Sequence, residues 1–378
     1  MNSYLDRRKF LGGASALALT PFVRGEGQGF AARPLKFLFM TDHHVESDFV
    51  QSHGLSKGEP VYEMWKPGDH AALVATYRFI SEDPFCRDCD FALFGGDQLN
   101  TGYLWLPADR DAELANYWRT LEALDLHAKT KGRTADFDFI ARPWRMRPHG
   151  EKAGPPVEVT PAPPASRVIA LQGNHDTGTD AFCRDCAFTA GGVRFICFFA
   201  SYVSLPPPPG RRFHSTAKIA DETIDFVERE MAKAAADPKI RQIVLVSHWG
   251  LAPAGRNSVC PIVDACRENG WSPNRSRLIA LAEKYGCRLY IHGHEHNGNF
   301  PIARVGPMTS VNCGSVTAET GGGAFAVFEI GDDLVKVHVY SRASAEERGG
   351  RAVVTERPKK LFVREFGLKN GLRENGRE

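Results

Sequence analysis

Short apolar runs recur along the chain, and a cluster of polar residues follows each of them. Five runs of four to six residues, rich in branched and aromatic side chains, lie at 35–40, 91–94, 168–171, 243–246 and 288–291. Runs of this length that stop at Gly, Asp, Asn or His are typical of buried strands. Helix-like stretches separate them at 70–81, 110–129, 221–236 and 275–285. The last two stretches directly precede strands, so the pattern predicts an α/β fold.

The rest of the chain divides into segments of different character. Residues 132–166 contain seven prolines and little periodicity, which predicts a long irregular insertion. Further strands are expected at 311–316, 324–330 and 334–340, with Gly331-Asp332-Asp333 as a hairpin turn. The expected domain therefore spans residues 35–341, and residues 342–378 are expected to form a charged tail.

The first residues have the layout of an export signal. The pair Arg7-Arg8 precedes an apolar run at 11–23 that is too short to span a membrane. The pair and this run resemble a twin-arginine (Tat) signal, although Asp6 stands where Ser or Thr is usual. We therefore expect residues 1–31 to be a signal peptide, the Tat machinery to be a partner, and the protein to be periplasmic or extracellular. A cytoplasmic protein with a chance basic start is the alternative. No later stretch of the sequence is long and apolar enough to cross a bilayer.

Composition and charge narrow the function classes. The 378 residues are 43% hydrophobic and 24% charged, which excludes whole-chain disorder and collagen-like repeats. The net charge is +2 and the middle of the chain is acidic, so long nucleic acid is not an expected partner. Two of the cysteine pairs lie in identical Phe-Cys-Arg-Asp-Cys segments, at 85–89 and 182–186. Zinc ribbons space their pairs by roughly 15–20 residues, so separate disulfides or free thiols are expected instead of a shared zinc ion.

Carboxylate, amide and imidazole side chains follow the predicted strands. Because the carboxyl ends of strands in an α/β sheet share the edge where ligands bind, these side chains are expected to lie together. Their chemistry suits Mn, Fe or Zn, and no cysteine is among them. They are too many for one tetrahedral ion, whereas two ions about 3.5–4 Å apart with one bridging carboxylate would use them all. The set comprises Asp42, His44, Asp97, Asn174, His175, His248, His294 and His296.

The order and form of these motifs resemble the calcineurin-like metallophosphoesterases. The motifs are Asp42-x-His44, Gly96-Asp97, Gly173-Asn174-His175-Asp176, Ser247-His248 and Gly293-His294-x-His296, and the resemblance covers about residues 35–330. It implies a four-layer αββα sandwich with two mixed β-sheets and a dinuclear metal site. One metal would be held by Asp42, His44, Asp97 and His296. The other would be held by Asp97, Asn174, His248 and His294, with Asp97 bridging.

The same resemblance implies hydrolysis of phosphate esters. Two divalent or trivalent ions would lower the pKa of a bridging water, and the resulting hydroxide would attack phosphorus. His175 lies next to a ligand and is not needed as one, so it is expected to protonate the leaving oxygen. Asp176 is expected to orient it. A small phosphodiester is the slightly favoured substrate. Phosphomonoesterase or nucleotidase activity, and a non-catalytic binding module on the same fold, are the alternatives.

Several further residues bear on substrate choice. Asn100 lies three residues after Asp97, where purple acid phosphatases carry a tyrosine ligand, so that subfamily is disfavoured. Trp249 is a candidate to line the site, whereas His43 and His292 are expected to be structural. Side chains of the Pro-rich insertion either hold an anionic or aromatic substrate group or form a solvated basic loop. These are Arg142, Trp144, Arg145 and Arg147.

Overall fold

A computed structural model gives the architecture of the chain. The residues it describes are 33–45, 68–100, 107–122, 137–146, 156–160, 168–177, 179–205, 214–252, 261–264, 272–316, 323–348 and 351–368. The expected signal at 1–31 lies outside these residues, as does Arg147. Every helix and strand named below belongs to one compact unit, Pro34–Glu378.

The first sheet has six strands in the order β19-β16-β15-β1-β2-β6. Three of them run parallel: β1 (Leu35–Met40), β2 (Phe91–Phe94) and β6 (Val168–Ala170). The other three join antiparallel: β15 (Ala324–Ile330), β16 (Leu334–Ser341) and β19 (Lys360–Gly367). The sheet is therefore mixed, and the expected turn between β15 and β16 closes with the Gly331 amide donating to the Leu334 carbonyl at 2.9 Å.

The second sheet has seven strands in the order β13-β14-β12-β11-β8-β7-β3. Its parallel centre comprises β8 (Val193–Cys197), β11 (Gln242–Val246), β12 (Leu289–His292) and β14 (Met308–Asn312). Antiparallel strands flank it: β13 (Ile302–Val305), β7 (Cys186–Ala190) and β3 (Ile140–Ala141). Two strands, β9 (Ala200–Leu205) and β10 (His214–Ile219), form a separate antiparallel pair.

The main hydrophobic core lies between the two sheets. In β1, Phe37 and Phe39 belong to this core, whereas Leu38 and Met40 belong to the cluster on the outer face. Phe37 meets the second sheet through an edge contact with Phe195, with ring centroids 5.2 Å apart. Successive strand residues point to opposite faces, so a strand that is apolar on both faces must be covered on both.

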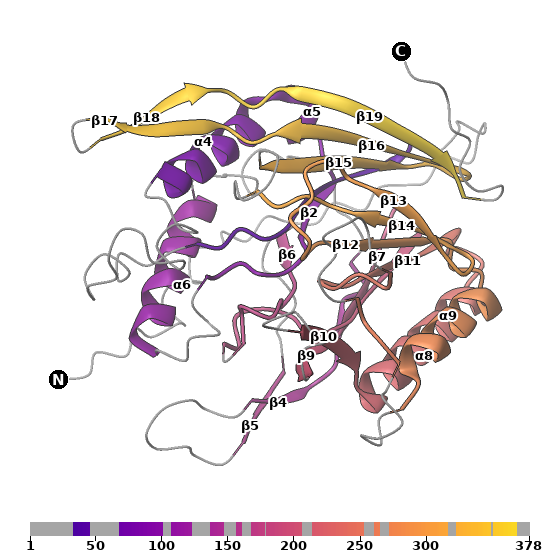
Figure 1. Ribbon diagram of the computed structural model, residues 1–378. Coiled ribbons are helices and arrows are strands. Elements are labelled where there is room, and N and C mark those ends of the chain that lie inside the picture. The colour runs from indigo at the N-terminus through magenta and orange to yellow at the C-terminus, as the bar shows by residue number, and fades with distance from the viewer. Residues whose placement is uncertain are drawn as a thin grey trace, which may run out of the picture. The chain divides into compact units, whose positions relative to one another are not determined.

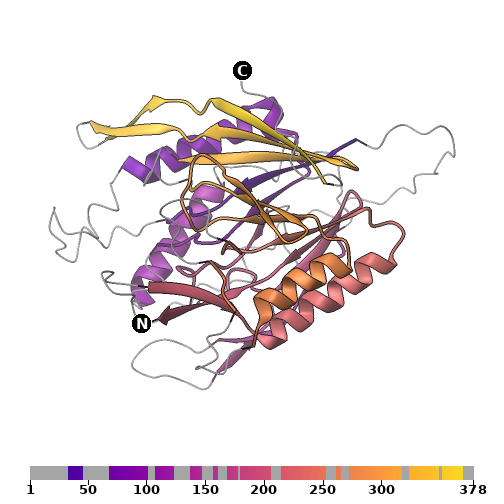
Figure 2. The ribbon, with the colours of Figure 1, turned by 45° about the vertical axis from the view of Figure 1, so that its right-hand side comes forward.

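Helices supply the outer cover (Figures 1 and 2). Next to the first sheet lie α4 (Gly68–Glu82), α5 (Pro84–Arg87) and α6 (Pro107–Glu122). Against the second sheet lie α8 (Asp221–Ala236) and α9 (Asn274–Lys284), side by side. The predicted four-layer αββα arrangement with two mixed sheets is confirmed. Within the described residues, no helix combines the length and apolarity needed to cross a membrane.

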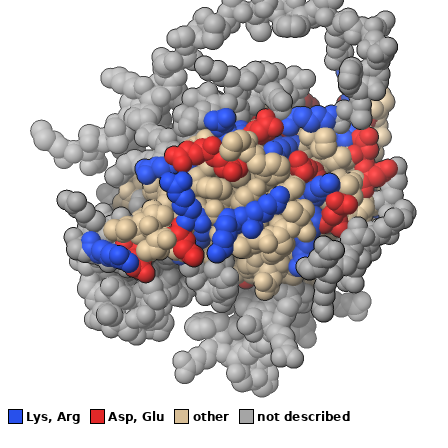
Figure 3. All heavy atoms as spheres, turned by 90° about the horizontal axis from the view of Figure 1, so that it is seen from above, with Lys and Arg blue, Asp and Glu red and all other residues tan. Residues whose placement is uncertain are grey.

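The expected charged tail at 342–378 differs from the structure. It contains β17 (Ser344–Arg348), β18 (Arg351–Glu356) and β19, and β19 is an edge strand of the first sheet. Phe366 of β19 is buried in the core between the sheets. On the exposed face, Lys336 and Glu365 pair across the strands at 3.4 Å, and basic and acidic side chains are interspersed (Figure 3). Because charged residues are frequent in this segment, its sequence lacks the apolar runs from which strands were predicted elsewhere.

The Pro-rich insertion at 132–166 also contains ordered strands. β3 joins the second sheet, while β4 (Trp144–Met146) and β5 (Val157–Val159) pair with each other. Arg142 donates from Nε to the Asp185 carboxylate at 2.7 Å, and Trp144 is buried. The described part of the insertion is thus anchored to the sandwich, in contrast to the long irregular segment that the sequence predicts.

Candidate metal centre

The loops after five strands bring the predicted site residues to one rim. Asp42 and His44 follow β1, Asp97 follows β2 and Asn174 follows β6. His248 follows β11, and His294 and His296 follow β12. The two sheets meet here, because the His294 amide donates to Asp42 Oδ2 at 3.0 Å.

Left-handed backbone conformations aim these side chains at one another. Five of the site residues have positive φ angles: Asp42 at 56°, His44 at 46°, Asp97 at 52°, His294 at 72° and His296 at 48°. Such conformations cost roughly 1–3 kcal/mol each in residues other than glycine, and they gather at functional sites. Backbone hydrogen bonds hold two of them, from Asp42 N to Gly96 O at 2.9 Å and from His44 N to Asp97 O at 3.0 Å.

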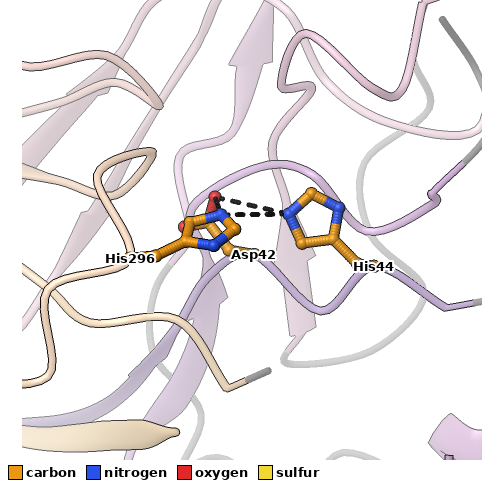
Figure 4. A group of neighbouring side chains, drawn as sticks. All are labelled: Asp42, His44 and His296. Carbon is orange, nitrogen blue, oxygen red and sulfur yellow. Dashed lines mark hydrogen bonds and ion pairs between the residues drawn. The ribbon is translucent and has the colours of Figure 1, made fainter. Parts of the chain in front are cut away.

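The first group of ligand atoms comprises Asp42, His44 and His296 (Figure 4). His296 Nε2 lies 3.1 Å from Asp42 Oδ1 and 3.1 Å from His44 Nε2, and His44 Nε2 lies 3.8 Å from Asp42 Oδ1. Burial favours the neutral form of Asp42, but the imidazoles of His248, His296 and His44 outweigh it and hold the Asp42 pKa well below its usual range. Two imidazoles and one carboxylate around one point could hold a metal ion.

A second group comprises Asp97, His248 and His294. His248 Nε2 lies 3.0 Å from Asp97 Oδ2 and 3.3 Å from His294 Nδ1. Burial alone would lower the pKa of His248, but Asp97 and Asp42 outweigh it and raise the pKa to about 9. The carboxylates therefore attract a positive charge at this position, and a metal ion would satisfy the same demand.

A third group joins the first two. His44, Asp97 and His175 also offer ligand atoms within 4.8 Å of one another, and His175 Nε2 lies 3.9 Å from Asp97 Oδ2. Asp97 thus belongs to two groups, as a bridging carboxylate would. His175, expected as an acid and not as a ligand, is close enough to ligate.

Two further observations show that the residues fit metal ions. Asn174 Oδ1 is buried and has no hydrogen-bond partner among the described residues, so this oxygen is available to ligate. Gly173 and Gly293 leave room for the carboxylates: an added Cβ would lie 2.1 Å from Asp97 Oδ1 and 2.6 Å from Asp42 Oδ2, respectively. The donor set of carboxylate, imidazole and amide oxygen suits Mn, Fe or Zn.

Backbone carbonyls fix the imidazole tautomers. His248 Nδ1 donates to Gly95 O at 3.1 Å, which leaves its Nε2 facing Asp97. His175 Nδ1 donates to Asn100 O at 2.6 Å, which leaves its Nε2 facing the same carboxylate. A carbonyl on one ring nitrogen is the usual way to orient a catalytic or ligating histidine.

Asp176 does not have the position that the sequence suggested. Its carboxylate accepts hydrogen bonds from the amides of Leu99 and Gly173, both at 2.8 Å, and so joins two site loops. Burial and the nearby Asp97 raise its pKa to about 7. In the described part of the chain, the orienting group for His175 is the Asn100 carbonyl, which sequence reasoning missed. Main-chain acceptors carry no side-chain signature, so the sequence could not indicate it.

Other candidates lie around the site. His43 packs against the rings of Phe94 and Tyr77, and burial lowers its pKa to about 4, in keeping with a structural role. His292 stacks on Tyr290, and burial likewise lowers its pKa to about 4. Trp249 is fully buried and lies against the His294 ring, with centroids 3.7 Å apart. It packs behind that candidate ligand and is shielded from solvent.

Residues 35–298 match the model of a family described as calcineurin-like phosphoesterase. The chain belongs to this family. It is therefore a phosphoric ester hydrolase with the metallophosphoesterase fold, and the groups described above are the candidate ligands for the two metals on which the family depends. The match covers all seven predicted ligand positions, from Asp42 to His296.

Solved structures with the same fold include a dimetal phosphatase from Danio rerio. It is 11% identical with a TM-score of 0.50, and the match covers 87% of this chain and 98% of that chain. A structure of PhoD is also similar, at 11% identity and a TM-score of 0.45, over 93% of this chain and 73% of that chain. No curated protein matches this sequence. The family assignment rests on the sequence match over residues 35–298, and the dimetal phosphatase shares the fold.

Proposed function

We propose that the protein hydrolyses a small phosphodiester at a dinuclear metal centre, with His175 as the proton donor to the leaving oxygen. The first metal would be held by Asp42, His44, Asp97 and His296, and the second by Asp97, Asn174, His248 and His294. When bound, two such ions neutralise phosphate oxygens and generate hydroxide at neutral pH. The ligand residues would fix the positions of the ions, and His175 would supply the proton.

The position of His175 is the observation that supports its role as the proton donor. Its side chain is 19% exposed, whereas the Asp97 side chain beside it is 1% exposed. Its Nδ1 is committed to the Asn100 carbonyl, so a second proton on the ring must sit on Nε2, on the side of Asp97. The imidazolium can therefore give that proton to a leaving oxygen in the site. An alkyl or ribosyl alcohol leaves poorly without a proton, so an acid at this position suits esters of such alcohols, and a small diester of this kind is the substrate proposed.

The proposed metal and acid roles separate in one pair of variants. Asp97→Ala removes the carboxylate shared by two ligand groups, so metal content should fall and activity should vanish on every ester. His175→Ala should keep the metal. Its kcat should fall by ~10²–10⁴-fold on a dinucleotide, the range typical of a positioned acid, and far less on bis-p-nitrophenyl phosphate. Equal losses on both esters, with metal retained, would assign His175 to phosphate binding.

A screen with p-nitrophenyl phosphate, bis-p-nitrophenyl phosphate and nucleotides distinguishes the alternatives. Faster turnover of the monoester than of the diester would favour a phosphomonoesterase or nucleotidase. A metal-loaded protein that binds these esters and turns none of them over would be a binding module, and the proposal would be rejected.

We also propose export through the Tat route, on the strength of the Arg7-Arg8 pair and the short apolar run after it. Replacing the pair with Lys-Lys should leave the protein in the cytoplasm, as measured by fractionation of cells. A form with the pair intact is the control. Unchanged export of the Lys-Lys form would refute the Tat assignment.

A further inference from the structure

Arg184 connects the Pro-rich insertion to the loop that carries Asn174 and His175. Its guanidinium lies over the Trp144 ring, 3.7 Å from the centroid, and over the Phe199 ring at 4.6 Å. Its Nε donates a hydrogen bond to Gln172 Oε1. Trp144 comes from β4 of the insertion, and Gln172 directly precedes the site loop that begins at Gly173. The side chain therefore links two regions that are separate in the sequence.

Gln172 connects Arg184 to the site loop through hydrogen bonds. Its Nε2 donates to the carbonyl oxygens of Asp176 at 2.9 Å and Thr179 at 3.1 Å. Gln172 is buried, and both ends of its amide are hydrogen-bonded. A buried amide whose donors and acceptor are all used has one favourable orientation. Arg184 selects that orientation, because its charged N–H requires the oxygen of the amide and not the nitrogen.

The loop held in this way includes the proposed acid. The His175 amide donates to Asp97 Oδ1 at 2.8 Å, and the ring reaches from the loop to the Asn100 carbonyl. A shift of the Asp176 and Thr179 carbonyls would carry the His175 ring with it. A displacement of about 1 Å at a reacting group can cost ~10²-fold in rate.

We propose that Arg184, clamped by Trp144 of the insertion, is a positioning residue for His175 and acts through Gln172. The inference rests on the proposed function, in which His175 protonates the leaving oxygen. It also assigns a role to the insertion: its buried tryptophan stiffens the catalytic loop from behind. Of the candidate substrate-binding side chains in the insertion, Arg142 and Trp144 face the sandwich through Asp185 and Arg184.

Two matched pairs of variants test the link. Arg184→Met keeps an unbranched stem between the two rings and removes the donor to Gln172. Its control is Arg87→Met, the same change in the identical pentapeptide, where the arginine is exposed in the last turn of α5. Trp144→Ala removes the stacked ring. Trp144→Phe is its conservative partner, because the Trp144 Nε1 has no hydrogen-bond partner among the described residues and the lost N–H therefore costs no bond.

The measured quantity is the ratio of kcat on a dinucleotide to kcat on bis-p-nitrophenyl phosphate. Both values come from the same preparation, so any loss of folded or metal-loaded protein cancels in the ratio. Arg184→Met and Trp144→Ala should lower the ratio by ~10-fold, part of the loss that a displaced acid produces. Arg87→Met and Trp144→Phe should stay within about twofold of the wild type. His175→Ala, measured alongside, sets the largest possible change.

The outcomes distinguish the inference from the function on which it rests. If His175→Ala lowers the ratio and Arg184→Met leaves it unchanged, the positioning role is wrong and the proposed acid stands. A change in Arg87→Met equal to that in Arg184→Met would also overturn it, because the effect would then not depend on contact with Gln172. An unchanged ratio in His175→Ala itself would reject the acid role, and the positioning role with it.

Discussion

The two Phe-Cys-Arg-Asp-Cys segments have the same sequence and different structures. In the first copy, residues 85–87 belong to the short helix α5, and Arg87 and Asp88 are exposed. In the second copy, the backbone of Cys183 pairs with that of Leu171 in an isolated β-bridge, and Cys186 begins β7. There the arginine stacks on Trp144 and the aspartate is buried.

The residues before each copy, and the strands beside it, explain the difference. Asp83 accepts a hydrogen bond from the Cys86 amide at 2.8 Å, and Pro84 occupies the first turn, so the first copy begins a helix. The second copy has Asp180 at the matching position but Ala181 in place of the proline. Its backbone instead pairs with Leu171, just after β6, and with β8, where Cys186 lies opposite Cys197. The conformation of five identical residues therefore depends on the surrounding structure. The arginine and aspartate pack against the rest of the protein in the second copy and are exposed in the first.

The largest expected difference between the two copies is the loss of protein stability when the aspartate of each is replaced. Asp185 binds Arg142, accepts from the Phe199 amide at 2.9 Å and from Thr223 at 3.0 Å, and its side chain is 1% exposed. Asp185→Asn breaks this pair and should lower the free energy of unfolding by about 3 kcal/mol, the lower end for a broken buried ion pair, because Arg142 retains some exposure. Asp88→Asn, at an exposed position, should cost less than about 1 kcal/mol.

Urea unfolding midpoints of the two variants measure this difference. The slopes of the unfolding curves should match the wild type, which would show that the denatured state is unchanged. Equal losses in both variants would mean that the second copy is no better packed than the first, and the comparison would fail.

Sequence patterns predicted the elements that have strong local signals. The strands at 35–40 and 91–94 and the helix at 221–236 lie where the apolar periodicity placed them. Strand β19 was missed because Lys360, Arg364 and Glu365 interrupt its apolar residues, and Phe366 is its one buried side chain, so the segment lacks an apolar alternation. The second pentapeptide could not be predicted either, because its conformation depends on strands that are distant in the sequence.

In the site too, some groups could be predicted from the sequence and others could not. Ligand candidates follow strands and carry a side-chain signature, so Asp42, Asp97 and His248 could be placed at one rim in advance. The Asn100 carbonyl that orients His175, and the two amides that bind Asp176, are main-chain groups. Their positions follow from left-handed turns such as that at Asp97, where φ is 52°. Sequence shows which chemistry reaches the rim, whereas the orientation of each group depends on the folded backbone.

The smallest predicted effect concerns the phenylalanines that begin the two copies. Lys36 Nζ lies 3.5 Å from the centroid of the Phe85 ring, and the Lys36 side chain is 6% exposed. Phe182 instead meets the edge of Tyr117, with centroids 5.2 Å apart. An ammonium over an aromatic face contributes about 0.5–2 kcal/mol, the larger values when it is desolvated, so only the first copy should be coupled to Lys36.

A double-mutant cycle isolates that coupling. Phe85→Leu and Lys36→Met, alone and together, should give an interaction free energy of about 1 kcal/mol in urea unfolding, because each single change already removes the contact. The matched cycle of Phe182→Leu with Lys36→Met should be additive within about 0.5 kcal/mol. The cycle cancels the effect of Lys36→Met on the Asp88 carboxylate, 4.0 Å from Lys36 Nζ, since that effect is present with either residue at 85. Additivity in the first cycle would show that the Phe85 ring gains nothing from the Lys36 ammonium. The two copies would then differ in their charged residues and not in their aromatic ones.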